Sequence, residues 1–292
     1  MKKTSVYLPD SLKKRLSALA GETHSSEAEL IREAIEERLA REANSQPAAR
    51  DSVDPPVAGR LVGIGVGPGP SGMITVEALT ALRRADRIVA PCTSAAAIGR
   101  AEAIVRQAAP DVVVERMVFV MEPDPAARAG ALGVVCDAIT KYLAAGDEVG
   151  FITLGDPNTY STVSSVVTGV LARRPTTPVV TVAGIMAFQA LASKAGVVLT
   201  DEQQSMVLLS AASEPEVVKR ELADPNRTVM FYKGGGRIET VADYLEQAGR
   251  LDQAVIGELI GMDGERVAPL AQVRDQPASY LSAVIAPAEG IS

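Results

Sequence analysis

The feature that most constrains this fold is a regular alternation of short apolar runs with longer amphipathic segments, beginning at Gly59. Apolar runs of four to eight residues rich in Val and Ile predict buried strands, and the longer patterns between them predict helices. The strands are expected at residues 61–66, 87–90, 112–119 and 148–154, and the helices at residues 75–85 and 129–146. Strands that alternate with helices are typical of a parallel α/β sheet.

After about Thr177 the pattern restarts. Five further strand candidates follow, at residues 179–184, 205–211, 227–233, 254–261 and 280–287. Two such sets of strands predict two α/β lobes, which we place at residues 59–177 and 178–292. We find no sequence repeat between them.

Residues 1–43 have a different character, rich in Lys, Arg and Glu. A short strand is expected at Thr4–Leu8, followed by a helix whose apolar stripe is Leu12, Leu16 and Leu19 and which we expect to end at Gly21. Ser25 is expected to cap a second helix. One strand and two helices cannot bury a core alone. Residues 44–58 hold three prolines and no periodicity, which indicates a linker.

This N-terminal pattern resembles the ribbon-helix-helix family of DNA-binding domains over residues 2–40. In that family two chains pair their strands into a ribbon that enters the major groove. The resemblance implies a homodimer with possible double-stranded DNA as partner. Strand alternation would turn Lys3, Ser5 and Tyr7 toward the groove, and the free N–H groups near Ser25 and Ser26 would hold a phosphate.

The charges of this segment leave a second interpretation open. Residues 1–20 hold five Lys or Arg against one Asp, whereas residues 21–43 hold three Arg against seven Glu. A dimerisation module without DNA therefore remains an alternative. The only histidine, His24, is expected to be an ordinary turn residue.

A glycine-rich loop follows the first strand of the α/β part, with the sequence GIGVGPGPSG from Gly63. It is not a dinucleotide fingerprint, because Pro68 and Pro70 stand where the last glycine is needed and no acidic residue follows the second strand. The glycines of this loop have no side chains, which allows a large flat or anionic ligand to approach the backbone closely. A second loop, Gly155-Asp156-Pro157, follows a strongly apolar strand, and ligands in open α/β sheets bind at such strand ends.

Five motifs occur in order along the chain: GIGVGPG, LGDPNTYST, VAGIMAFQALASKAGVVL, TVMFYKGGGR and GELIGMDGERVAPL. In combination they resemble the tetrapyrrole methylases of cobalamin synthesis over nearly all of residues 59–288. The resemblance implies two α/β lobes with S-adenosylmethionine (SAM) bound between them. It also implies methylation of precorrin-2, or of its cobalt form, at C-20.

Carried over position by position, the resemblance implies two sets of site residues. The substrate would contact Gly67, Pro68 and Gly69. The cofactor would contact Pro68, Gly155, Asp156, Thr159, Tyr160, Met186, Ala187, Lys233, Gly261 and Met262. The sequence departs from the family twice: no Asp follows Gly69, and Met186 replaces a hydroxyl residue after a turn that here begins Ala183-Gly184.

Methyl transfer from a sulfonium needs alignment and exclusion of water more than acid–base groups. We name no general base; Glu258 and Tyr160 are weak candidates, with fold support as the alternative role. Lys233 or Arg237 could meet substrate carboxylates, or be surface cations. Two other functions stay open: a ribbon-helix-helix regulator whose methylase-like part senses a tetrapyrrole or SAM, and a methyltransferase of the same fold with another substrate.

Charge, hydropathy and cysteine usage argue against several other classes of protein. The net charge of −7 argues against wholesale coating of nucleic acid. No apolar run has the length of a membrane span, and no apolar segment follows the N-terminal lysines as in a signal peptide. Cys92 and Cys136 match no metal-ligand spacing, and we expect both to be reduced thiols in a cytoplasmic protein.

Overall fold

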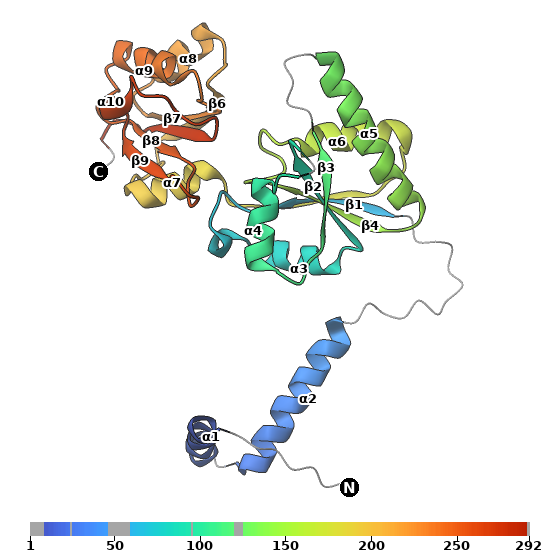
Figure 1. Cartoon of the computed structure of the whole chain (residues 1–292). Helices are drawn as coiled ribbons and strands as arrows, with labels where there is room; N and C mark the ends of the chain where they lie inside the picture. Colours follow the sequence, from blue (N-terminus) through green and yellow to red (C-terminus); the bar gives the residue numbers. More distant parts are fainter. Residues whose placement is uncertain (1–8, 24, 46–58, 95, 120–124, 291–292) are drawn as a thin grey trace. The chain divides into compact units, whose positions relative to one another are not determined.

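The computed structural model describes residues 9–23, 25–45, 59–94, 96–119 and 125–290. The chain divides into two compact units, Met1–Pro55 and Pro56–Ser292 (Figure 1). Within the described residues no helix is long and apolar enough to cross a membrane.

The N-terminal unit contains two helices, α1 (Asp10–Thr23) and α2 (Glu27–Ser45). Gly21 lies inside α1 rather than ending it, so that expectation is wrong; the helix continues because Gly21 does not take the left-handed conformation that ends helices. The cap of α2 is also one residue later than expected. Ser26, not Ser25, accepts the Glu29 N–H over 3.2 Å.

The described helices of this unit leave several apolar side chains exposed. Leu12 and Leu19 are each 45% exposed, Ile35 is 50% exposed, and α1 has no buried residue. These exposures agree with the expectation that the segment cannot form a core alone. The expected strand Thr4–Leu8 and the residues Lys3, Ser5 and Tyr7 lie outside the described residues.

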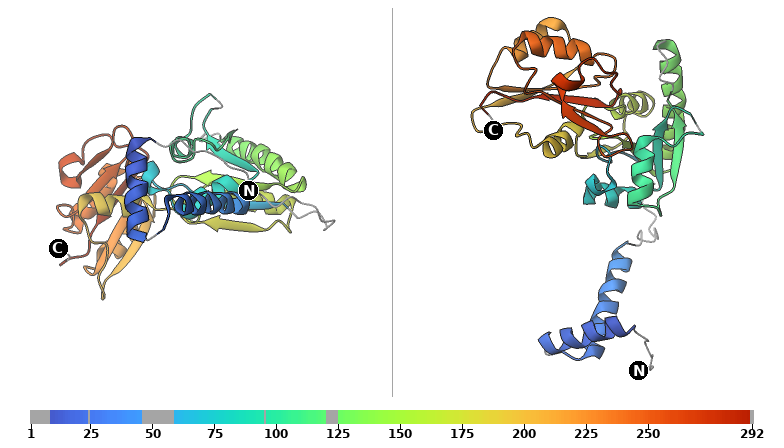
Figure 2. Two further views of the ribbon diagram at one scale, coloured as in Figure 1. Left: turned by 90° about the horizontal axis from the view of Figure 1, so that it is seen from below. Right: turned by 60° about the vertical axis from the view of Figure 1, so that its left-hand side comes forward.

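The second unit begins with a five-stranded sheet in the order β3-β2-β4-β1-β5, in which all neighbouring strands are parallel. Its strands are β1 (Arg60–Gly65), β2 (Arg87–Cys92), β3 (Val114–Val118), β4 (Glu148–Thr153) and β5 (Val179–Val182). Helices α3 (Val76–Arg84) and α4 (Arg100–Ala108) pack on one face, and α5 (Pro125–Ala144) and α6 (Val163–Arg173) pack on the other (Figures 1 and 2). The result is a three-layer α/β/α lobe.

Strand β5 corrects the expected division of the lobes. We predicted that the second set of strands begins at residue 178, but Leu61 to Ile64 of β1 pair with Val179 to Val182 of β5. The boundary at 177/178 is therefore wrong, because β5 completes the edge of the first sheet. The strand is short and mostly exposed, with Val182 as its buried residue, so its pattern does not reveal which sheet it joins.

The second lobe has a mixed sheet in the order β6-β7-β10-β8-β9. Strands β6 and β7 are parallel, and the other neighbours are antiparallel, so the parallel arrangement expected from the sequence holds for the first lobe and not for this one. The strands are β6 (Ser205–Ser210), β7 (Arg227–Tyr232), β8 (Val255–Glu258), β9 (Arg266–Pro269) and β10 (Ser282–Ala286).

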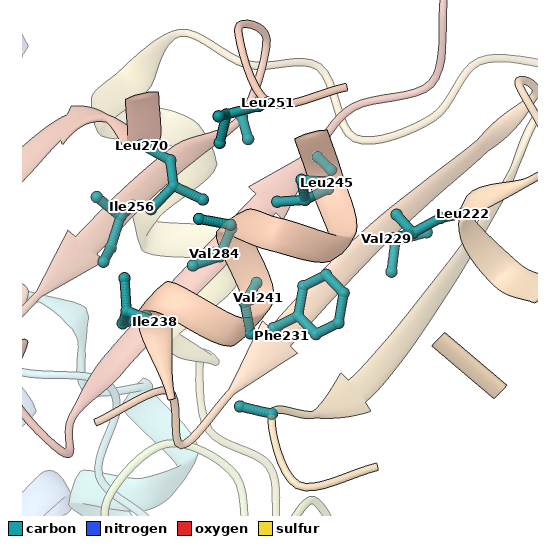
Figure 3. Packing of buried hydrophobic residues seen from close by; sticks show 14 of the residues in the cluster. Leu222, Val229, Phe231, Ile238, Val241, Leu245, Leu251, Ile256, Leu270 and Val284 are labelled. Atoms are coloured by element: carbon teal, nitrogen blue, oxygen red, sulfur yellow. The ribbon is translucent and has the colours of Figure 1, made fainter. Parts of the chain in front are cut away.

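Helices cover both faces of this sheet. One face packs against α8 (Pro215–Leu222), α9 (Ile238–Gln247) and α10 (Leu270–Val273), and their shared core includes Phe231, Val241 and Val284 (Figure 3). The other face packs against α7 (Ala187–Ala195). The segment between β5 and α7 therefore joins the first sheet to a helix of the second lobe.

Candidate active site

Three loops converge at the carboxyl ends of β1, β4 and β5. A Cβ atom on Gly65 would lie 2.6 Å from the Gly155 oxygen and 2.7 Å from the Gly184 nitrogen. A Cβ on Gly184 would lie 2.0 Å from the same Gly155 oxygen. Glycine is required here because the three backbones touch, and the loops expected to line the site are thus brought together.

The first and second loops are also joined by hydrogen bonds. Gly67 and Gly155 form an antiparallel bridge, in which the Gly155 N–H donates to the Gly67 oxygen over 2.7 Å. Both residues have positive φ, +83° and +67°, which glycine adopts without strain. The GPGPSG loop is therefore a paired backbone element at the edge of the site.

Asp156 ties the second loop to the third. One carboxylate oxygen accepts the Gly184 N–H over 3.1 Å, and the other accepts the Asn158 N–H over 2.9 Å and the Thr159 hydroxyl over 3.4 Å. Three donors of this chain thus occupy the carboxylate. These contacts indicate a structural role for Asp156, which fixes the second and third loops relative to each other.

The first loop packs closely against the second lobe. A Cβ on Gly69 would lie 1.9 Å from the Ile260 oxygen, and a Cβ on Gly261 would lie 2.0 Å from Cδ of Pro70. Pro68 and Gly69 are buried. One departure from the family pattern is therefore a packed position: Pro70, which stands where the acid is missing, contacts Gly261.

Three aromatic side chains lie beside these loops. The centre of the Tyr160 ring lies 6.3 Å from that of Tyr232, and the centre of the Phe188 ring lies 6.1 Å from that of Tyr232. The Lys233 ammonium sits 5.6 Å from the centre of the Tyr160 ring, a cation–π contact. The Tyr160 hydroxyl donates to the Leu208 oxygen over 3.4 Å, so this side chain of the first lobe reaches the second.

The late glycine motif is held by an ion pair. The Gly261 N–H donates to Glu265 over 2.8 Å, and the same carboxylate pairs with Lys194 of α7 over 2.7 Å. The Lys194 hydrogen bond lowers the pKa of Glu265, which keeps the carboxylate charged. Met262, next in the motif, is half-buried.

Glu258 is a poor candidate for a general base. It is 5% exposed, one of its oxygens pairs with Arg266, and the other accepts the Ser279 N–H over 2.5 Å. Both oxygens are therefore engaged in holding strand β8 to its neighbours. Lys233 and Arg237, by contrast, are exposed.

The expected phosphate site at the start of α2 is already filled. The backbone N–H and the hydroxyl of Ser26 both donate to the Glu29 carboxylate over 2.9 Å. These hydrogen bonds lower the pKa of Glu29, so it carries a negative charge at the helix N-terminus where a phosphate was expected. Ser25 is half-buried and its hydroxyl donates weakly to Thr23 over 3.4 Å.

Sequence reasoning missed Tyr232, Gln189 and Glu265, which support the site from within. Tyr232 ends strand β7 in an apolar run, so its position reads as ordinary core. Among the described residues no group of His, Cys, Asp and Glu could hold a metal ion.

Comparison with known proteins agrees with this geometry. Residues 60–273 match the family model of Tetrapyrrole (Corrin/Porphyrin) Methylases, and residues 2–42 match that of Ribbon-helix-helix protein, copG family. The chain is 30% identical over 238 residues to a precorrin-2 C(20)-methyltransferase of Sinorhizobium sp, covering 78% of this chain and 95% of the relative. It is 30% identical over 232 residues to a cobalt-precorrin-2 C(20)-methyltransferase of Salmonella typhimurium, with the same coverages.

Solved structures share the fold. The cobalt precorrin-4 methyltransferase CbiF superposes with a TM-score of 0.59 at 17% identity, over 81% of this chain and 98% of that one. A uroporphyrin-III C-methyl transferase from Thermus thermophilus, complexed with S-adenyl homocysteine, gives 0.55 at 20% identity, over 78% and 97%.

The chain therefore belongs to the tetrapyrrole (corrin/porphyrin) methylase family, and its N-terminus carries a segment similar to ribbon-helix-helix proteins. As a member of that family it is a SAM-dependent methyltransferase. The resemblance and the two-lobed fold expected from the sequence are confirmed.

Proposed function

We propose that this protein transfers a methyl group from SAM to C-20 of precorrin-2 or cobalt-precorrin-2. The observation that carries the proposal is the 30% identity to two enzymes named for these reactions, each matched over 95% of its length. The convergence of the expected loops at the carboxyl ends of three strands supports it.

The residues at the converging loops fit a cofactor with one polar and one apolar part. Gly155, Gly184 and Ala187 are half-buried and have little or no side chain, which allows a ligand to approach the backbone closely. Met186 and Met262 are half-buried apolar side chains, and such surfaces with a few polar groups are typical of cofactor sites. SAM, when bound there, supplies an electrophilic methyl group and leaves as a neutral thioether.

The protein's own contribution is positioning. In this proposal the donor is held by the residues carried over from the family, with Asp156 acting through the loops that it ties together. The full set is Pro68, Gly155, Asp156, Thr159, Tyr160, Met186, Ala187, Lys233, Gly261 and Met262. Alignment of the attacking carbon with the methyl group and exclusion of water supply most of the rate increase in such a reaction.

On the substrate side, Gly67, Pro68 and Gly69 are buried. We therefore assign them the role of shaping the loop that borders the tetrapyrrole. The exposed cations Lys233 and Arg237 are the proposed partners of substrate carboxylates. No side chain is assigned as general base, because both oxygens of Glu258 are occupied.

The test is an anaerobic reaction of the purified protein with SAM and precorrin-2, with and without cobalt, read by mass. A product heavier by one methyl group, located at C-20 by NMR, is expected. Methylation of neither substrate, or methylation at another carbon, would refute the proposal. Measurable ligand binding without turnover would favour the alternative that the methylase part senses a tetrapyrrole or SAM.

For the N-terminal segment we propose dimerisation, with contact to double-stranded DNA as the alternative. The exposed apolar side chains of α1 and α2 and the match over residues 2–42 support pairing with a second copy. The Glu29 carboxylate at the start of α2 weighs against a phosphate contact there. Light scattering and DNA titration of the full chain and of a chain lacking residues 1–43 would separate these roles. A deletion chain that remains a dimer would place self-association in the methylase part.

Cys92 and Cys136 are buried thiols, which supports a reducing, cytoplasmic location.

A further inference from the structure

In the first turn of α7, the backbone N–H groups of Met186, Phe188 and Gln189 have acceptors in this chain. The first N–H groups of a helix lack intrahelical partners and need other acceptors. Here the Met186 N–H donates to the Gln189 side chain over 2.9 Å, and the Gln189 N–H donates to the Met186 oxygen over 3.1 Å. The Phe188 N–H donates to the phenol oxygen of Tyr232 over 3.0 Å.

Tyr232 thus supplies the hydroxyl that the turn itself lacks. A Ser or Thr at the cap position would accept one of these N–H groups, but the cap residue is Met186, whose side chain is a poor acceptor. The phenol comes instead from the end of β7, 44 positions further along the chain. Helix α7 is therefore anchored at its start to strand β7.

The phenol is held in its neutral form. Burial raises the pKa of Tyr232 to about 12, although the hydrogen bonds from Phe188 and Ala187 act in the opposite direction. At neutral pH the phenol oxygen therefore accepts the Phe188 N–H without placing a negative charge beside the loops.

The ring of Tyr232 also contacts the second loop. Tyr160 lies against it, and Tyr160 and Lys233 both have left-handed backbone, with φ of 47° and 61°. Such conformations are strained for residues other than glycine and persist only where the surrounding structure holds them. Tyr232 directly precedes Lys233 in the chain, and its ring lies beside the ring of Tyr160, so it adjoins both strained residues.

We infer that Tyr232 is a positioning residue of the methyl-donor site, which fixes the Met186-Ala187 turn and the Tyr160 loop relative to each other. It acts through these residues rather than by touching the reacting atoms. The inference rests on the proposed function, because the turn and the loop are proposed contacts of the donor.

The test compares two tyrosine-to-phenylalanine variants of the full chain. Tyr232→Phe removes the phenol oxygen and keeps the ring. Tyr142→Phe is the matched control, because it also removes one hydrogen bond of a part-buried phenol, the 2.7 Å bond to Glu115. Tyr142 lies on α5 in the first lobe. Affinity for S-adenosylhomocysteine is measured by calorimetry and the midpoint of thermal unfolding is recorded for each.

We expect Tyr232→Phe to weaken S-adenosylhomocysteine binding about five- to twentyfold, the range of a lost helix cap. Tyr142→Phe should leave the affinity within about twofold while lowering the unfolding midpoint. In turnover assays the KM for SAM should rise in Tyr232→Phe more than kcat falls. Unchanged affinity in Tyr232→Phe, or equal losses in both variants, would overturn the inference.

A second variant covers the case in which Tyr232→Phe does not fold. Gln189 is exposed, and Gln189→Ala removes the other side-chain acceptor of the same turn. A weakening of about twofold or more is expected, and unchanged affinity would count against the role of the turn. If the unmodified protein binds neither SAM nor S-adenosylhomocysteine, the proposed function itself fails, which distinguishes the two results.

Discussion

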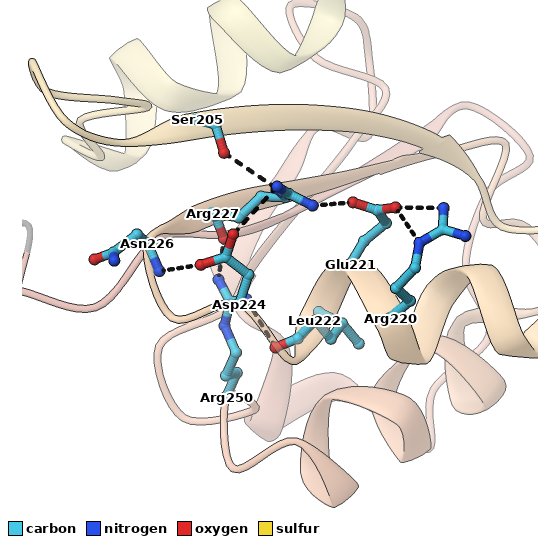
Figure 4. Close-up of polar contacts among 8 residues, drawn as sticks. All are labelled: Ser205, Arg220, Glu221, Leu222, Asp224, Asn226, Arg227 and Arg250. Atoms are coloured by element: carbon cyan, nitrogen blue, oxygen red, sulfur yellow. Dashed lines mark hydrogen bonds and ion pairs between the residues drawn. The ribbon is translucent and has the colours of Figure 1, made fainter.

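We expect removal of the Arg250 side chain to lower the free energy of unfolding more than removal of any other side chain of similar size in the second lobe. Its side chain is 2% exposed, yet it has no carboxylate partner among the hydrogen bonds that the structure describes. Its guanidinium donates to the backbone oxygens of Arg227, Ala286 and Pro287 at 2.7, 3.0 and 2.7 Å, and more weakly to that of Leu222 at 3.4 Å. Figure 4 shows the contacts with Arg227 and Leu222. It therefore joins the start of β7, the end of β10 and the end of α8.

The expected cost of Arg250→Met follows from these contacts. The three carbonyls share the two N–H groups of one nitrogen, Nη2. Each buried carbonyl left without a donor costs about 1–3 kcal/mol, so the loss of two donors would cost up to about 6 kcal/mol. Part of this is offset, because the variant no longer buries a guanidinium, and that burial costs several kcal/mol in the unmodified protein. We expect a net loss of about 2–5 kcal/mol, or a fall of about 5–15 °C in the unfolding midpoint of a lobe pair of this size.

Arg220→Met is the matched control, since Arg220 lies close by on α8. Its side chain is 68% exposed and pairs with Glu221, so its removal should cost less than about 1 kcal/mol. Both variants would be unfolded in urea and by heat, with circular dichroism as the readout. Equal midpoints for Arg250→Met and Arg220→Met would refute the reasoning that the buried guanidinium holds these three chain segments together.

Three further predictions concern the first lobe. Asp156→Asn replaces an acceptor oxygen by a donor against a backbone N–H, and we expect about tenfold weaker S-adenosylhomocysteine binding by calorimetry, whereas unchanged binding would contradict the loop-fixing role. Gly69→Ala places a Cβ 1.9 Å from a backbone oxygen, so it should lower the unfolding midpoint by several degrees, while Gly72→Ala, with no atom within 4 Å of its Cβ, should not. The pKa of Glu102 is lowered, first by Arg116, so its contribution to stability is present above the ordinary value of 4.5 and is lost as pH falls through the lowered folded value. Glu102→Gln should therefore be less stable than the unmodified protein at pH 6, with the gap shrinking in acid; a pH-independent gap in urea midpoints would exclude this linkage.

Much of the first lobe could be predicted from the sequence because its strands are buried on both faces. The apolar runs located β1, β2 and β4 to within one or two residues. The helix expected at residues 75–85 is α3, which begins at Val76 with its cap at Thr75. These features are local, since they follow from residues adjacent in the chain.

Features that depend on distant residues could not be predicted in the same way. The sheet to which β5 belongs is decided by its pairing with β1, more than a hundred residues earlier. Strand β9 is short, and none of its four residues is buried, so no pattern marked it. The site residue Tyr232 looked like core, because its hydrogen bond to Phe188 spans 44 positions.

The two departures from the family pattern acquire a physical meaning in the fold. Read alone, the missing acid after Gly69 and the missing hydroxyl at Met186 could indicate a methylase that has lost its activity. At the first position, Pro70 fills the space against Gly261, where the absence of a Cβ allows the contact. At the second, Gln189 and Tyr232 take over the capping of α7. At both positions the fold keeps the loops together and the first turn of α7 capped, and a methylase and a sensor both need such packing. The altered loops therefore do not favour the regulator over the enzyme, and the comparison of turnover with ligand binding decides between them.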